Sequence, residues 1–442
     1  MTMFNNILKF TQKKSEYLYK NSLFLQHIDK LILVSIISVF FASTVMSSDV
    51  IGFIALITVF LTVIKILTKP GERLSSQTFE LWLLAYFMIV IISLAGSTLF
   101  HLSLKGFLKT FTYLGFYFSL VQYLKNNKSK IPLILASIGV CISFEAIAGF
   151  LQNFAHVEEI STWQDVSSLN PEEVMTRVYG TLKPYNPNLL GGYFVAGIPD
   201  VYGLAADFLT VKKYKFASVS LALALLATIT LFLTGCRGSY IGMMVIITGM
   251  FAVSAKYLWQ NYKKIYLSVV GGVVAFATAA LLLVSSLRAR VLSIFAMRQD
   301  SSNSFRFNVY HSSVEMFKDN WLLGIGVGNQ NFREIYGLYM KTGFDALSAY
   351  NIFLEIGVES GVFALIAFVG FLITLIKNSV NFILKSAETK DVIIVSAALI
   401  SICAVSIHGL VDTVFFRPQI QFIFWTMAAI AGTMISTRDS HL

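Results

Sequence analysis

The stretch SSNSFRFNVYHSSVEMFKDNW, residues 301–321, lies in the longest polar interruption between the apolar runs of this chain, the island 286–350. Its large side chains Tyr310, Val314, Phe317 and Trp321 recur at i, i+4, i+7 and i+11, so they share one face of a helix. The spacing predicts an amphipathic helix that lies on an apolar surface without crossing it.

A glycine series, GIGVGN at 324–329, follows this helix. Each glycine would cost a helix interior roughly 1 kcal/mol, so the series predicts a turn with close backbone approach. It superficially resembles a phosphate-cradling loop, but no strand precedes it as such a motif requires. We therefore predict no nucleotide site here.

Composition places the chain in a membrane. Its 442 residues are 56% hydrophobic and 13% charged, whereas soluble domains have about 45–50% apolar and about 25% charged residues. We expect an all-α polytopic membrane protein with membrane lipid as a partner. The net charge of +10 is explained by loop lysines and predicts no nucleic-acid partner. The three cysteines form no disulfide or metal pattern, so we predict no metal and no cofactor.

Apolar runs long enough to span a bilayer define the organisation, because a helix needs about 20 residues to cross roughly 30 Å of hydrocarbon. The fourth run is interrupted by Lys109, and the tenth carries Glu355 and Glu359. We predict a single membrane domain, 1–442, with one large external loop, 286–350. The twelve predicted spans are 31–48, 51–68, 78–96, 107–124, 131–152, 188–210, 216–234, 239–258, 265–285, 351–376, 391–409 and 418–436.

Lysines and arginines accumulate in alternate loops, which predicts that those loops face the cytoplasm. Five lysines precede the first span, and basic clusters follow the second, fourth, sixth, eighth and tenth. Both termini are therefore predicted to be cytoplasmic, and loop 286–350 is predicted to be external. No signal-peptide cleavage pattern precedes the first run, so it is expected to stay as an anchor.

This orientation places several unusual polar side chains at the external face. An arginine at a membrane boundary is paired, snorkels to the surface or serves a site, and its planar guanidinium suits phosphate or carboxylate. His408 and Asp412, spaced i, i+4, are either a satisfied pair or part of a site, and Glu355 and Glu359 either pair with an arginine or bind a proton or ion. The outward-facing candidates are Arg177, Arg237, Arg306, His408, Asp412 and Arg417.

Several short motifs carry a resemblance to a known family. They are Gly180-Thr181-Leu182 with Asn186-Pro187-Asn188, the turn 234–238, Arg306, the segment 323–326 and the segment 351–361. In this order the chain resembles the O-antigen ligase-like superfamily of bacterial inner-membrane proteins, which includes O-antigen polymerases. Segments 303–308, 346–350, 408–413 and 417–419 are most similar to its cyanobacterial IctB group, which is named for bicarbonate transport.

The resemblance implies a site at the periplasmic face. In ligases of this superfamily, outward-facing arginines hold the diphosphate of a polyprenyl-linked glycan, and a histidine acts as base on the acceptor hydroxyl. Arg237 and Arg306 match the arginine positions, but Tyr350 stands where the histidine is expected. Tyrosine, with a pKa near 10, is a poorer general base than histidine, near 6.5. Either His311 or His408 replaces it, or the chain lacks ligase chemistry.

Two functions follow from these observations. The first is metal-independent glycosyl transfer, or a related reaction, on a polyprenyl-diphosphate-linked glycan for a surface polysaccharide such as lipopolysaccharide. The second is transport or accumulation of inorganic carbon, with the arginines holding a small anion. The expected substrate-binding residues are Arg177, Arg237, Arg306, Asn351, Asp412 and Arg417.

Overall fold

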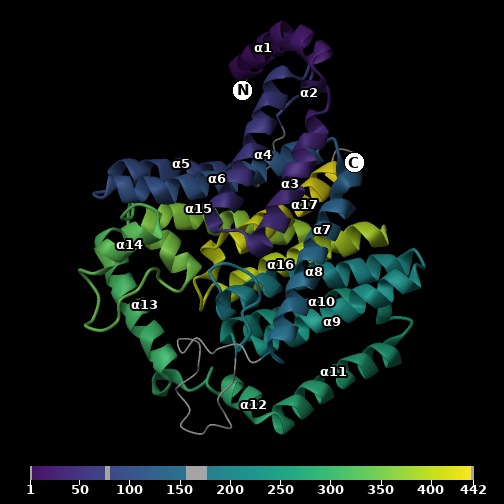
Figure 1. Ribbon diagram of the computed structural model, residues 1–442, viewed down its shortest axis with the longest axis vertical. Helices are drawn as coiled ribbons and strands as arrows, with labels where there is room; N and C mark the ends of the chain where they lie inside the picture. The colour runs from purple at the N-terminus through teal and green to yellow at the C-terminus, as the bar shows by residue number, and fades with distance from the viewer. Residues whose placement is uncertain (1, 75–79, 156–176, 440–442) are drawn as a thin grey trace.

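The computed structural model describes residues 2–74, 80–155 and 177–439, and these ranges contain helices and no strand (Figure 1). Their long helices follow the predicted spans closely. These are α3 (Ile28–Val45), α4 (Ser48–Thr68), α5 (Glu80–Gly96), α6 (Phe100–Leu124), α7 (Ile131–Gln152), α8 (Pro187–Thr210), α9 (Tyr214–Leu233), α10 (Arg237–Leu258), α11 (Lys263–Leu283), α15 (Ile352–Lys385), α16 (Thr389–His408) and α17 (Pro418–Asp439).

The described residues include ten helices that are long and apolar enough to cross a membrane. Helix α5 is a shorter apolar helix of 17 residues, and α6 contains Lys105 and Lys109. The chain is therefore an all-helical, polytopic membrane protein, and twelve as the number of spans stays a prediction.

Side-chain contacts join the loops into two groups. Among the loops predicted to be cytoplasmic, Lys125 donates to the carbonyl of Arg73 at 3.4 Å and Lys256 to that of Ser386 at 3.0 Å. Among those predicted to be external, the Thr181 hydroxyl donates to the carbonyl of Thr44 at 2.8 Å. The long helices connect the two groups, so each group lies at its own end of the bundle. Which end faces the cytoplasm stays a prediction from the charges.

Shorter helices accompany the bundle. Helix α1 (Thr2–Asn21) leads through α2 (Leu23–Gln26) into α3, and Gln12 fixes α1 by donating to the carbonyls of Ile66 at 2.8 Å and Glu72 at 2.9 Å. The sequence analysis did not predict this helix. Helix α11 stands apart from the other long helices in Figure 1, and none of its residues is buried. The loop beyond it contains α12 (Ser285–Leu292), α13 (Ser301–Asp319) and α14 (Asn329–Tyr336).

Helix α13 confirms the predicted amphipathic helix but buries a different face. Val309 and Met316 are fully buried, whereas Val314 is 38% exposed. Trp321, at 53% exposed, lies beyond the helix end. The buried face is thus displaced by one residue from the predicted one. The hydroxyl-bearing Ser312 and Ser313, which are also buried, belong to this face, and a pattern of large apolar residues overlooks them.

The glycine series forms the predicted close turn, and its partner is a break in α15. At Gly361 the backbone φ is 79° and the helix is interrupted. There Ile325 and Gly326 donate their N–H groups to the carbonyls of Val358 and Glu359 at 3.0 and 2.9 Å. A Cβ on Gly324 would lie 2.3 Å from the Glu359 carbonyl carbon, so only glycine permits this contact. The tenth predicted span, 351–376, is therefore a broken helix that continues to residue 385.

Candidate functional site

The turn between α9 and α10 brings two candidate residues together. Gly235 adopts φ 62°, and a Cβ there would lie 3.2 Å from the Arg177 side chain. A Cβ on Gly238 would lie 2.5 Å from the His408 ring. These two glycines therefore provide the space into which Arg177 and His408 pack. Arg177 also donates through Nε to the carbonyl of Thr234 at 2.8 Å.

Arg237 is held in a buried ion pair. Its Nη1 lies 2.9 Å from Oδ1 of Asp300 and donates to the Ser293 hydroxyl at 3.1 Å. The side chains of Arg237 and Asp300 are only 10% and 5% exposed. Asp300 also caps α13 by accepting from the Asn303 N–H at 2.8 Å. Arg237 thus ties α10 to the loop between α11 and α15.

Arg306 on α13 binds the loop between α16 and α17. Its Nε donates to the carbonyl of Val411 at 2.9 Å, and its Nη1 donates to the Ser302 hydroxyl at 2.5 Å. Its Nη2 lies 3.9 Å from Oδ2 of Asp412, a looser ion pair. The guanidinium also stands 5.7 Å from the centre of the Tyr350 ring.

Cys236, His408 and Asp412 form a buried group beside these arginines. Nε2 of His408 lies 3.8 Å from the Cys236 sulfur and 4.0 Å from Oδ2 of Asp412. Burial raises the pKa of the Cys236 thiol, but the contact with His408 outweighs burial and leaves that pKa below its usual value. The three donor atoms lie within 4.8 Å of one another and are of types that bind zinc. However, Arg306 approaches the same Asp412 oxygen, and its positive charge opposes a cation there. The metal-free site stays a prediction.

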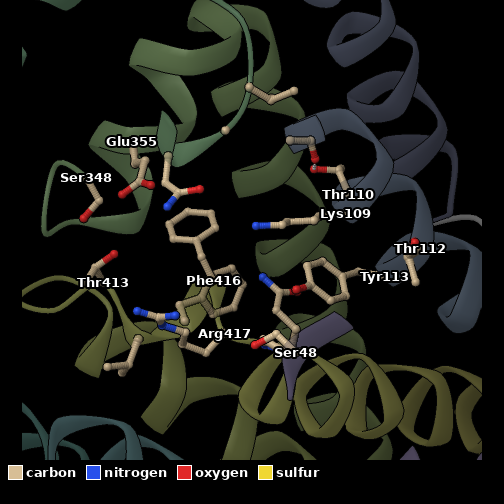
Figure 2. A pocket seen from close by; sticks show the side chains of 18 of the residues that line it. Ser48, Lys109, Thr110, Thr112, Tyr113, Ser348, Glu355, Thr413, Phe416 and Arg417 are labelled. Carbon is tan, nitrogen blue, oxygen red and sulfur yellow. Dashed lines mark hydrogen bonds between the residues drawn. The ribbon is translucent and has the colours of Figure 1, made fainter. Parts of the chain in front are cut away.

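A cavity of about 650 Å³ opens beside this group, and we call it the outer pocket (Figure 2). It lies between α4, α6, α15, α17 and the start of α8. Apolar side chains at one edge are largely exposed, with Phe53 at 65% and Leu108 at 53%. The ionisable and phenolic residues that line it are Asp49, Tyr86, Lys109, Tyr113, Tyr350, Glu355, Glu359, Asp412 and Arg417.

Two cations face the outer pocket, and the charge of one of them, Lys109, acts on the nearby Glu359. Lys109 extends from α6 toward the centre of the cavity, and Arg417 enters it from the start of α17 (Figure 2). Neither side chain has a hydrogen bond or ion pair with any residue that the structure describes, in contrast to Arg237 and Arg306. Arg417 was among the residues predicted from the sequence and Lys109 was not, although a lysine that interrupts an apolar span is itself a signal of function.

Two buried glutamates complete the polar wall. Glu355 is 3% exposed and Glu359 is 7% exposed. Glu355 accepts the Ala349 N–H at 3.3 Å, and Glu359 accepts the Gly328 N–H at 2.8 Å. Within the described residues neither forms an ion pair with an arginine, so the structure does not show the first of the two alternatives drawn from the sequence. The two carboxyl groups instead face the cavity.

Tyr350 occupies the expected histidine position beside the pocket. Its backbone adopts φ 53°, and burial raises the pKa of its hydroxyl above the usual value. The side chain is therefore a neutral phenol at pH 7 and a poor proton acceptor. The following Asn351 caps α15 by accepting from Phe353 and Leu354, and its amide donates to the carbonyl of Leu410 at 3.2 Å.

The structure brings together most of the residues selected from the sequence. Tyr350, Asp412 and Arg417 line the outer pocket. A layer of contacts behind that lining contains Arg177, Arg237, Arg306, Asn351 and His408. His311 is exposed on α13 and contributes nothing to the lining.

Comparison with known proteins gives one match. The sequence profile of the O-antigen ligase family matches residues 222–369, about a third of the chain, from the second half of α9 into α15. This region contains Arg237, Arg306 and Tyr350. A comparison with curated proteins found no match. The profile match, on an all-helical membrane fold, supports membership of the O-antigen ligase-like superfamily.

Proposed function

We propose that this protein transfers a glycan from a polyprenyl diphosphate to an acceptor hydroxyl at the outer face of a bacterial inner membrane. The observation that carries the proposal is the outer pocket, where Lys109 and Arg417 face a cavity without a hydrogen bond or ion pair in the described ranges. Two cations of this kind suit the charge and the oxygen atoms of a diphosphate. The family match supports a glycan-related substrate.

The shape of the pocket supports a lipid-linked substrate. Its volume of about 650 Å³ lies within the range of about 300–1,000 Å³ that is typical for ligand sites. Phe53, Leu56 and Leu108 give it an exposed apolar edge on α4 and α6. A polyprenyl chain can rest against that edge while the diphosphate lies near the cations.

The reaction requires a proton acceptor. The acceptor oxygen bonds to the anomeric carbon, the bond from that carbon to the diphosphate breaks, and the polyprenyl diphosphate leaves with the electron pair. The hydroxyl proton moves to a base, and the neutral phenol of Tyr350 is unsuited to this step. We assign the step to the pocket carboxyl group of Glu359, which accepts the Gly328 N–H at 2.8 Å and lies within the influence of the Lys109 charge. Tyr350 would then donate a hydrogen bond or orient the sugar.

One feature favours inorganic carbon transport as a second candidate. Helix α15 is broken at Gly361, beside Glu359 in the pocket. Broken helices often form the ion sites of secondary transporters. The cavity is much larger than a bicarbonate ion, however, and so fits a lipid-linked glycan better.

One experiment separates the two candidates. In a deletion strain of the native bacterium, surface polysaccharide is analysed by gel and mass spectrometry, and bicarbonate uptake is measured on the same cells. The strain is complemented with the wild type, with a Lys109→Gln/Arg417→Gln double variant or with Lys105→Gln. Lys105 lies on the same helix but outside the pocket lining, so it controls for loss of charge alone.

The glycan proposal expects truncated or missing polysaccharide that the wild type and Lys105→Gln restore and the double variant does not. Membrane levels of all three proteins should be equal by immunoblot. Unchanged polysaccharide together with a defect in uptake would defeat the glycan proposal and support transport.

A further inference from the structure

A buried carboxyl group lies within the bundle, away from the outer pocket. Asp200, on α8 directly after Pro199, is 1% exposed. It is ten residues from the helix end at Thr210, about 15 Å at the rise of an α-helix, which places it near the middle of a bilayer. Its Oδ2 has no hydrogen-bond partner in the part of the chain that the structure describes.

A small cavity leads to this carboxyl group. Its volume is about 20 Å³, enough for roughly one water molecule. Gly203 forms part of its wall, and a Cβ there would lie 3.1 Å from Ala397 of α16.

The other polar side chains of the cavity, Asp207 and Lys390, lie at the end of the bundle at which the cavity opens. Asp207 lies two helical turns beyond Asp200, and its Oδ1 is likewise without a described partner. Lys390, at the start of α16, is exposed. Helix α7 adds only apolar side chains to the lining, and neither α9 nor α10 contributes to it. Lys390 belongs to the loop group that is predicted to be cytoplasmic.

We infer that Asp200 is a proton-binding site, reached through this cavity from the face that carries Lys390. An isolated carboxylate is very unfavourable in an apolar interior, so such a group takes up a proton instead. The water-sized cavity and Asp207 provide the route by which that proton exchanges. The inference is independent of the reaction at the outer pocket.

Helix α8 joins this site to the outer pocket. Its first residues, Asn188 and Leu189, line that pocket. Next to Pro199, where the helix lacks one backbone N–H, the Ser401 hydroxyl of α16 donates to the carbonyl of Ala196 at 2.6 Å. Asp200 and the outer pocket therefore share helix α8.

The test uses the full-length protein in nanodiscs and dicyclohexylcarbodiimide, which reacts with protonated carboxyl groups in apolar surroundings. Labelled sites are identified by peptide mass spectrometry between pH 5 and 9. Wild-type protein should be labelled at Asp200, with labelling that falls as pH rises. Asp200→Asn should lose this label alone. No labelling at Asp200 at any pH, in samples where other buried carboxyl groups react, would overturn the inference.

Two charge reversals test the route. Lys390→Glu places a negative charge at the mouth, so the labelling midpoint of Asp200 should rise by on the order of one pH unit. Lys264→Glu makes the same change on α11, which contributes nothing to the cavity, and should leave the midpoint unchanged. An equal midpoint in the wild type and Lys390→Glu would refute access from this face. Protection of Asp200 by sodium at constant pH would refute a proton site in favour of a cation site.

Discussion

Two sets of cations in and beside the outer pocket differ in their partners. Arg237 and Arg306 are enclosed by carboxylates, hydroxyls and carbonyls of the protein. Lys109 and Arg417 face the outer pocket and form neither a hydrogen bond nor an ion pair in the described ranges, although the charge of Lys109 acts on Glu359. A cation that the protein already neutralises stabilises the fold, whereas an unpartnered cation at a cavity is available to a ligand. From this contrast we expect the first pair to contribute to stability and the second to bind the substrate.

The strongest test of this contrast breaks the buried ion pair. Arg237→Ala leaves Asp300 buried without its partner, and loss of one member of a buried pair costs about 3–5 kcal/mol. The melting temperature in detergent should fall sharply. Arg333→Ala is the matched control, because the Arg333 and Asp345 side chains are 53% and 50% exposed. Equal melting temperatures for the two variants would show that Arg237 is not a structural cation.

A smaller effect, on activity alone, is expected in the outer pocket. Lys109→Gln and Arg417→Gln each remove a charged hydrogen bond to the diphosphate, worth about 1.5–3 kcal/mol, which corresponds to roughly 10- to 100-fold in kcat/KM. Their melting temperatures should match that of the wild type. Glycan transfer from a polyprenyl-diphosphate donor in membrane vesicles measures the effect, with Lys105→Gln as the control. Full activity in both variants would show that neither Lys109 nor Arg417 binds the substrate.

Tyr350 lies between the two sets, and we expect a modest effect from it. Because burial raises its pKa, the hydroxyl loses its proton only above its usual range near pH 10. Tyr350→Phe should therefore keep activity within about tenfold, the lower limit of the same hydrogen-bond range, and leave the pH profile between 6 and 8 unchanged. Glu355→Gln and Glu359→Gln are measured alongside. Retained activity in both glutamine variants, with loss in Tyr350→Phe, would return the role of base to Tyr350.

The smallest expected effect is that of chelation. The arginines around Cys236, His408 and Asp412 oppose a bound cation, so EDTA treatment should leave transfer activity and melting temperature unchanged. Metal analysis of the purified protein provides the second measurement. One tightly bound zinc per chain, lost together with activity in Cys236→Ala, would contradict this prediction.

The sequence predicted the spans well because each depends on local features, namely a run of about 20 apolar residues and the polar residues at its ends. Contacts between distant segments could not be predicted from the sequence. Nothing around Arg237 indicates that Asp300 is its partner, and nothing around Lys109 indicates that α15 and α17 close a pocket beside it. The buried face of α13 is displaced by one residue from the predicted face, because serines form part of the buried side.

The contact between the glycine turn and the break in α15 also determines how late in the synthesis of the chain the pocket can form. Ile325 and Gly326 leave the ribosome well before Val358 and Glu359, whose carbonyls they bond. During translation the turn must therefore remain without these partners until the following helix has been made. A complete polar wall exists only after the last third of the chain has been made, so a truncated chain would carry the glycine turn but not the pocket.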